Sequence, residues 1–180
     1  IKVIAKNRIT TMIAVPRMMQ KLLAENEFSG DNISCIEDIY VGGDLVSEEL
    51  VHKFDARMKE CGGKGVLSPG YGLTETSSVC TVSKSDFLSG SVGKPINAVE
   101  VRVVDENLQE VPCGSVGELL VAGDQIMSGY VYDEEATKKA LISIDGKTWV
   151  RTGDYFRQDE TGRLFFMGRK KRLIKISGIN

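Results

Sequence analysis

The residues best suited to chemistry are gathered in the segment Tyr71-Gly72-Leu73-Thr74-Glu75. Beside a nucleotide, Tyr71 can cover a purine ring, and Gly72 lets backbone amides approach closely. Thr74 can donate a hydrogen bond to a phosphate oxygen, and Glu75 offers the hard oxygen ligand that Mg²⁺ prefers. Glycine-rich loops are common, so the alternative for this segment taken alone is an ordinary surface turn.

The elements that lead to this segment alternate between helix and strand. A helix is expected from Val15 to Leu23, with Pro16 in its first turn, and a buried strand from Ile36 to Val41. A second helix should start after the N-cap Ser47, and a strand from Gly65 to Leu67 follows it. This order predicts an α/β layer whose loops lie at the carboxyl edge of the sheet, where such sheets bind ligands.

The pattern changes near Gly90 to short strands and turns. We predict strands at residues 99–104, 117–121 and 149–150 and a pair of strands around residues 159–162, with one short helix near 133–141. The predicted fold class is α/β, in which a partial α/β sheet layer is followed by a small, mostly antiparallel, barrel-like β subdomain. The expected limits are 1–88 for the α/β part and 89–167 for the β-rich part, with residues 168–180 as a hinge and the start of a further domain.

Composition excludes several classes of function. The 180 residues are 42% hydrophobic, so the chain can bury a core without disulfides or a structural metal. A net charge of -2 disfavours binding to nucleic acid or to anionic membrane. No apolar run reaches the roughly 20 residues needed to span a bilayer. We expect a reduced, soluble, cytoplasmic protein, because the four cysteines form no CxxC pair: Cys35, Cys61, Cys80 and Cys113.

Both ends of the sequence look cut. The chain begins at Ile1 inside an apolar stretch and stops shortly after the strand-like run Leu173–Ile176. A strand without a neighbour exposes its backbone polar groups. We therefore expect the remaining parts of a longer parent chain to be partners of these residues, which are either a designed piece or a proteolytic product.

Several motifs then follow one another in a fixed order. Together they resemble the adenylate-forming superfamily, which includes acyl-CoA synthetases, luciferase and the adenylation domains of peptide synthetases. The resemblance runs from about residue 33 to the final residues, and the chain is most like part of the large N-terminal domain of an acyl-CoA synthetase. It is carried by Gly42-Gly43-Asp44, Tyr71 to Glu75, Gly117-Glu118-Leu119, Gly129-Tyr130, Arg151-Thr152-Gly153-Asp154 and Gly168-Arg169.

The resemblance implies a role for each nucleotide-side residue. Tyr71 should pack on adenine, Thr74 should contact the α-phosphate, and Glu75 should hold Mg²⁺; Thr74 and Glu75 are thus the catalytic candidates. Asp154 should accept hydrogen bonds from both ribose hydroxyls, and a carboxylate can take two donors at once. For a lone Thr-Gly-Asp the alternative is a turn between strands.

The other nucleotide-binding candidates are implied in the same way. The turn beside adenine is expected at Gly42, Gly43 and Asp44, and the remaining positions are Gly70, Gly72, Leu73 and Arg169. Many members of the superfamily carry Ala or Glu in place of Asp44. Lys171 occupies the hinge position, where the alternative is a solvated basic run.

The implied reaction joins ATP and a carboxylic acid into acyl-AMP, which CoA then converts to acyl-CoA. The phosphate-binding loop and the domain with the adenylation lysine should lie outside residues 1–180, so we expect the isolated chain to be inactive or nearly so. No charged residue obviously awaits an α-amino group, which favours a fatty or aromatic acid. The alternatives are an adenylation domain that loads a carrier protein and a noncatalytic nucleotide sensor.

Overall fold

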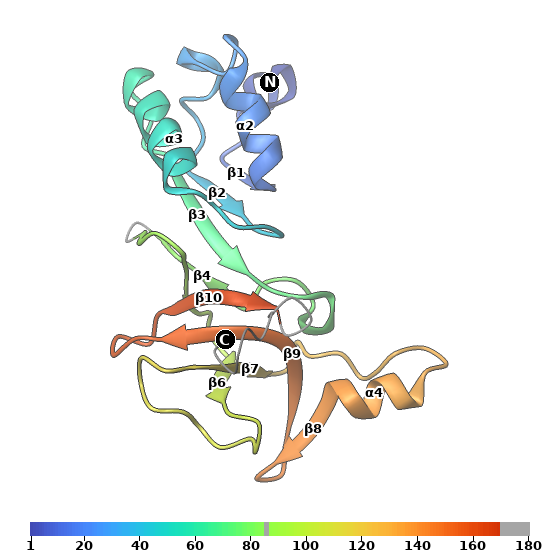
Figure 1. The fold of residues 1–180 in the computed structure, drawn as a ribbon. Coiled ribbons are helices and arrows are strands. Elements are labelled where there is room, and N and C mark those ends of the chain that lie inside the picture. The colour runs from blue at the N-terminus through green and yellow to red at the C-terminus, as the bar shows by residue number, and fades with distance from the viewer. Residues whose placement is uncertain (85–86, 170–180) are drawn as a thin grey trace. The chain divides into compact units, whose positions relative to one another are not determined.

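The computed structural model describes residues 1–84 and 87–169, which form two units (Figure 1). The first unit comprises Ile1–Tyr71 and Val82–Gly93, and the second comprises Gly72–Thr81 and the residues from Lys94 onward. The units are therefore interleaved in sequence. The domain limits near residues 89 and 168 stay predictions.

The first unit alternates helices with strands that pair in parallel. Strand β2 lies between β1 and β3, with Val41 opposite Ala14 on one side and opposite Pro69 on the other. Helices α2 and α3 lie side by side next to these strands (Figure 1). The elements are α1 (Lys2–Asn7), β1 (Thr11–Ala14), α2 (Pro16–Ala24), the 3₁₀ helix Gly30–Asn32, β2 (Asp38–Val41), α3 (Glu48–Glu60) and β3 (Val66–Tyr71).

The ends of α2 and α3 follow from their sequences. Pro16 occupies the first turn of α2, where a missing N–H removes no helical hydrogen bond. At the start of α3, Ser47 Oγ accepts a hydrogen bond from Leu50 N at 3.2 Å. The helix ends at Glu60 with Cys61 as its C-cap, and the following Gly62 has a φ of 66°. The helices predicted at these places are confirmed.

The core of the first unit lies where the strands meet α2 and α3. It is a single apolar cluster contributed by both helices and the strands, and its fully buried members include Met19, Ile39, Phe54, Met58 and Leu67. Two strand limits differ from the prediction. Strand β2 begins only at Asp38, and β3 continues to Tyr71 because Ser68 and Pro69 pair with β2.

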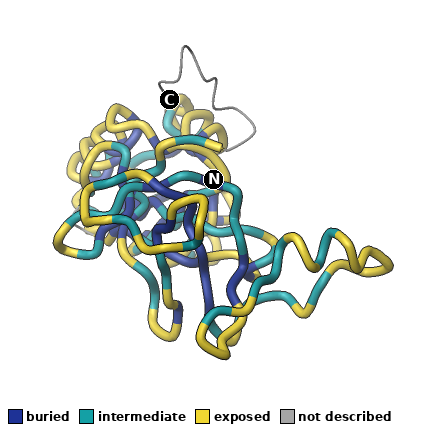
Figure 2. The backbone as a smooth tube through the Cα atoms, turned by 60° about the horizontal axis from the view of Figure 1, so that its bottom comes forward, coloured by how far each residue is buried: buried dark blue, intermediate teal, exposed yellow. Residues whose placement is uncertain are grey.

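The second unit is mainly antiparallel, as predicted. Strands β6, β7, β9 and β10 pair in that spatial order, and β8 pairs with β9. Six of the seven residues of β7 are buried, and buried Trp149 of β9 packs with Leu120 and Ala122. Figure 2 shows the buried stretches of the backbone in dark blue. The elements are the 3₁₀ helix Thr74–Thr76, β6 (Glu100–Val104), β7 (Val116–Ala122), α4 (Glu134–Ala140), β8 (Leu141–Ile144), β9 (Lys147–Gln158) and β10 (Leu164–Arg169).

Two further strands, β4 (Thr81–Val82) and β5 (Ser91–Pro95), lie where the chain passes between the units. The predicted fold class, an α/β part followed by a mainly antiparallel β part, is confirmed. Among the described residues, the helices are all too short or too polar to cross a bilayer.

Candidate functional site

The segment predicted to bind the nucleotide begins at the end of β3 and closes in a short 3₁₀ helix. Its fold depends on Thr76, which is buried. Thr76 Oγ1 accepts a hydrogen bond from Leu73 N and donates one to Leu73 O, each at 3.0 Å. Thr74 is exposed and Glu75 is half-buried, so the two catalytic candidates present their polar groups at the surface of the loop.

Glycine is the one residue type that this loop accepts at position 72. A Cβ built on Gly72 would lie 1.4 Å from Ser78 O, which no side chain tolerates. Ser77 and Ser78 also have positive φ angles, 52° and 104°, so the chain reverses sharply just after the 3₁₀ helix. The glycine therefore allows the reversed backbone to return close to its own start.

The glycines at the ends of β2 and β3 lie together in the first unit. A Cβ at Gly42 would be 3.1 Å from Gly70 O, so the two backbones approach closely. Gly43 has a φ of 82°, and the exposed Asp44 accepts a hydrogen bond from Leu45 N through Oδ1 at 2.8 Å. Asp44 thus stabilises its own turn in this structure.

Asp154 and Arg169 are direct neighbours on β9 and β10, where they lie opposite each other in the strand register. Arg169 Nε donates a hydrogen bond to Asp154 Oδ1 at 2.8 Å. The Asp154 side chain is 1% exposed, whereas that of Arg169 is 57% exposed. The structure therefore brings together the two residues predicted on the ribose side, with the carboxylate buried beneath the guanidinium.

The Thr-Gly-Asp sequence is not a turn between strands, and that alternative reading is wrong. It lies inside β9, where residues 152–154 oppose the single residue Leu119 of β7 and form a bulge. Gly153 takes a φ of 67°, and Thr152 Oγ1 donates a hydrogen bond to Leu119 O at 2.8 Å. A bulge of this kind changes the direction in which the following side chain, that of Asp154, extends from the strand.

Glu118 holds this bulge in place, a role that the sequence analysis did not assign. Its carboxylate is buried and forms two hydrogen bonds with the Arg151 guanidinium, one of them from Nε at 3.2 Å. It also accepts a hydrogen bond from Gly153 N at 3.3 Å. The hydrogen bond with Glu118 raises the pKa of Arg151. The signal available in the sequence was the pair of Gly-Glu-Leu and Arg-Thr-Gly-Asp motifs.

The predicted metal ligand Glu75 has a partner that the sequence analysis also left without a role. Tyr130 Oη donates a hydrogen bond to Glu75 Oε1 at 2.6 Å. Within residues 1–84 and 87–169, no group of three or more His, Cys, Asp or Glu side chains is arranged to hold a metal ion. A single protein carboxylate suits Mg²⁺ when phosphate oxygens and water supply the other ligands. The predicted hinge residue Lys171 lies outside the described residues.

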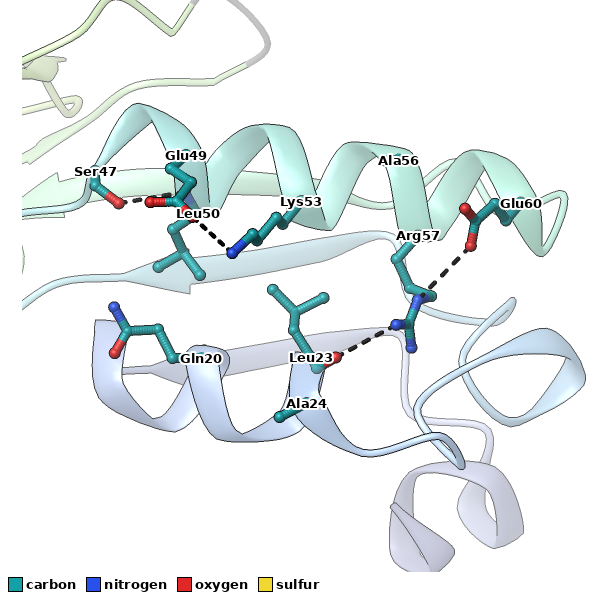
Figure 3. Close-up of a pocket in the computed structure, with 10 residues that line it drawn as sticks. All are labelled: Gln20, Leu23, Ala24, Ser47, Glu49, Leu50, Lys53, Ala56, Arg57 and Glu60. Atoms are coloured by element: carbon teal, nitrogen blue, oxygen red, sulfur yellow. Dashed lines mark hydrogen bonds and ion pairs between the residues drawn. The ribbon is translucent and has the colours of Figure 1, made fainter.

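The first unit also has a groove between α2 and α3 (Figure 3). Its charged side chains pair with one another, Lys53 with Glu49 and Arg57 with Glu60. Arg57 also donates a hydrogen bond to Phe28 O at 2.7 Å. A second hydrogen bond, from Arg57 to Leu23 O at 3.3 Å, joins α3 to α2, and we assign the groove a structural role.

The nucleotide-side candidates are thus distributed over both units. Gly42, Gly43, Asp44, Gly70 and Tyr71 belong to the first unit, and Gly72, Leu73, Thr74, Glu75, Asp154 and Arg169 belong to the second. A sequence profile of the family described as "AMP-binding enzyme" matches residues 1–131. The chain belongs to this family.

Individual AMP-binding enzymes are similar along the whole chain. A long-chain-fatty-acid–CoA ligase of Salmonella typhimurium is 36% identical over 182 residues, which cover 100% of this chain and 31% of that protein. A 4-coumarate–CoA ligase of Glycine max is 31% identical and is covered over 60% of its length, against 97% of this chain. The chain spans about a third of the length of the fatty-acid ligases that it matches.

The fold agrees with a solved structure of the same kind. The O-succinylbenzoate–CoA synthetase of Bacillus subtilis, in complex with ATP and magnesium ion, superposes with a TM-score of 0.83 at 26% identity. The match covers 98% of this chain and 35% of that protein. The chain is therefore homologous to ATP-dependent acyl-CoA ligases, and the predicted resemblance to the adenylate-forming superfamily is confirmed.

Proposed function

We propose that these residues are the nucleotide-binding part of an AMP-forming acid–CoA ligase whose acid is fatty or aromatic. The observation that carries the proposal is the pairing of Asp154 with Arg169 in a family member that also presents Thr74 and Glu75 on one loop. The acids in the names of two relatives, long-chain fatty acid and 4-coumarate, support this range of acids. All named relatives act with CoA, which favours CoA over a carrier protein as the acceptor.

In the first step, an oxygen of the acid carboxylate attacks the α-phosphorus of ATP, and the bond to the β-phosphate oxygen breaks. Acyl-AMP and pyrophosphate are the products. Thr74 would donate a hydrogen bond to an α-phosphate oxygen, and Glu75 would ligate Mg²⁺, which neutralises phosphate charge when bound. In the second step, the CoA sulfur attacks the acyl carbon and AMP leaves.

The adenosine side of this proposal assigns Tyr71 to adenine and Asp154 to the ribose hydroxyls, with Arg169 beside them. Gly42, Gly43, Gly70, Gly72 and Leu73 would form backbone that approaches the nucleotide closely. Because Asp154 is 1% exposed beneath a far more exposed Arg169, we infer that Arg169 moves aside when ribose binds. Asp44 keeps a proposed place beside adenine, and Lys171 keeps its proposed place as the hinge.

The deciding experiment is pyrophosphate exchange into ATP by the full-length protein, with a panel of acids that includes palmitate, 4-coumarate and an α-amino acid. Exchange that depends on a fatty or aromatic acid, followed by thioester formation that requires CoA, is the expected result. Exchange with the amino acid alone, without CoA turnover, would favour carrier loading. ATP binding without any exchange would favour a nucleotide sensor.

The 180-residue chain provides the matching control. We expect it to give no detectable exchange under conditions in which the full-length protein is active, because the phosphate loop and the adenylation lysine are expected elsewhere.

An Asp154→Ala substitution in the full-length protein should weaken ATP binding about tenfold or more, since a carboxylate that accepts two hydroxyl donors is lost. Unchanged affinity would reject the ribose assignment.

A further inference from the structure

The loop that carries Glu75 is joined to a second segment of the same unit, residues 125–130. Three hydrogen bonds connect them. Met127 N donates to Glu75 O at 2.8 Å, and Ser77 Oγ donates to Gln125 O at 2.7 Å. The third is the hydrogen bond from Tyr130 Oη to Glu75 Oε1. Both the backbone and the side chain of Glu75 are therefore held from one neighbouring segment.

Tyr130 is itself fixed by the start of α4. Its backbone N–H donates to Thr137 Oγ1 at 2.8 Å, and the same hydroxyl donates to Asp133 O at 2.8 Å. Asp133 in turn caps α4, accepting a hydrogen bond from Ala136 N. Gly129 leaves room for this arrangement, since a Cβ there would lie 2.9 Å from Thr137 Cγ2. These contacts explain why Gly129 and Tyr130 precede Thr137 at this separation in the sequence.

The hydrogen bond from Tyr130 makes the two carboxylate oxygens of Glu75 differ in their contacts. Oε1 accepts from Tyr130, and in the described part of the chain no hydrogen bond or ion pair is made by Oε2. A phenol donates well to a carboxylate. The hydrogen bond therefore orients the Glu75 carboxylate through Oε1 and leaves Oε2 for another ligand.

We infer that Tyr130 is a positioning residue that orients the Glu75 carboxylate for Mg²⁺ bound with ATP, anchored through Thr137. The inference rests on the proposed function, because Glu75 is a metal ligand only there. Tyr130 does not touch the metal in this arrangement. Its contribution is to fix the rotamer of Glu75 before ATP arrives. The entropy cost of ordering this side chain would otherwise oppose binding.

The test compares ATP binding with and without Mg²⁺ in the full-length protein carrying Tyr130→Phe. By isothermal titration calorimetry, affinity for ATP with Mg²⁺ should fall about threefold to tenfold, since one hydrogen bond to a charged group is lost. Affinity for ATP in the presence of EDTA should not change. A general loosening of the fold would weaken both, so the selective loss distinguishes positioning from a structural role.

Tyr132→Phe is the matched control, because it removes the same hydroxyl two residues away, from a side chain that is fully exposed. It should leave both affinities unchanged. Thr137→Val should reproduce part of the Tyr130→Phe loss, and Thr137→Ser, which keeps the hydroxyl, should restore it. Glu75→Gln sets the upper limit of the selective loss.

The outcomes separate this inference from the function on which it rests. If the unsubstituted protein exchanges pyrophosphate and binds ATP more tightly with Mg²⁺, but Tyr130→Phe behaves identically, the inference alone is overturned. If the unsubstituted protein shows neither property, the proposed function fails, and the positioning role fails with it.

Discussion

Glu118 and Asp154 are buried carboxylates on neighbouring strands of the second unit, and each is hydrogen-bonded to an arginine. A buried charge without a partner costs several kcal/mol, so each pair is expected to be required for local order. Their tasks differ. Glu118 also accepts from Gly153 N inside the β9 bulge, whereas Asp154 is the residue that the bulge positions.

A Glu118→Gln substitution should therefore destabilise the second unit and disturb Asp154 without touching the nucleotide. We expect a loss of about 1–3 kcal/mol in the free energy of unfolding, a range that allows for partial exposure of Arg151. Chemical denaturation followed by fluorescence of buried Trp149 measures it. Glu106→Gln, at an exposed carboxylate, is the control and should change stability by less than about 0.5 kcal/mol.

If Glu118→Gln proves as stable as Glu106→Gln, the bulge does not depend on this carboxylate. If stability falls but ATP affinity of the full-length protein does not, Glu118 stabilises the strands without setting the position of Asp154. Both results would restrict Glu118 to fewer roles than the contacts indicate.

Helices with clear end signals could be predicted from the sequence, and strands that depend on distant partners could not. Pro16 and Ser47 mark α2 and α3 by local chemistry, and both helices begin where those residues predict. Strand β1 went unpredicted because its pairing with β2 decides its existence, and Ile13 on it is 83% exposed. Strand β9 was predicted in two pieces, at Trp149-Val150 and just before the turn at residues 159–162, although it runs without a break from Lys147 to Gln158.

The candidate site shows the same limit. Residue types identified Glu75 and Asp154, because a carboxylate in a Gly-rich motif is a recognisable local signal. Two contacts could not be identified from spacing: the hydrogen bond from Tyr130 to Glu75 spans 55 positions, and that from Arg151 to Glu118 spans 33. Arg169 was found only through the resemblance. Tertiary contacts, which no local pattern records, decide these roles.

The loop after β3 depends on Gly72, which leads to a prediction at the scale of this element. Gly72→Ala would place Cβ 1.4 Å from Ser78 O, so the backbone of residues 72–78 must shift. We expect a loss of about 2–4 kcal/mol in the free energy of unfolding and no measurable ATP affinity in the full-length protein. Denaturation and calorimetry measure the two effects.

Gly146→Ala is the comparison for that substitution. Gly146 has a φ of 74°, and a Cβ added there would meet nothing within 4 Å, so only backbone strain of about 1 kcal/mol is expected. Equal effects of the two substitutions would mean that the close approach of Gly72 to Ser78 does not constrain the loop.

For the molecule as a whole, the four cysteines report on both units. All four are free thiols; Cys113 is exposed, Cys80 is buried, and Cys35 and Cys61 lie between these extremes. Burial raises the pKa of Cys80. The Cys80 thiol donates a hydrogen bond to Thr76 Oγ1, the atom whose hydrogen bonds with Leu73 hold the Glu75 loop. Because the thiolate is the reactive form, both burial and the raised pKa slow the reaction of Cys80.

Alkylation by iodoacetamide at about pH 8, followed by mass spectrometry of peptides, should therefore modify Cys113 first and Cys80 last. We expect Cys80 to react at least about a hundredfold more slowly than Cys113, since it must wait for local opening of the loop. In the full-length protein, ATP with Mg²⁺ should slow Cys80 further and leave Cys113 unchanged, because a ligand at Thr74 and Glu75 stabilises the closed loop. Cys113→Ser identifies the fast phase. Reaction of Cys80 at the Cys113 rate would show that the loop opens freely, and that the hydrogen bonds around Thr76 do not hold it.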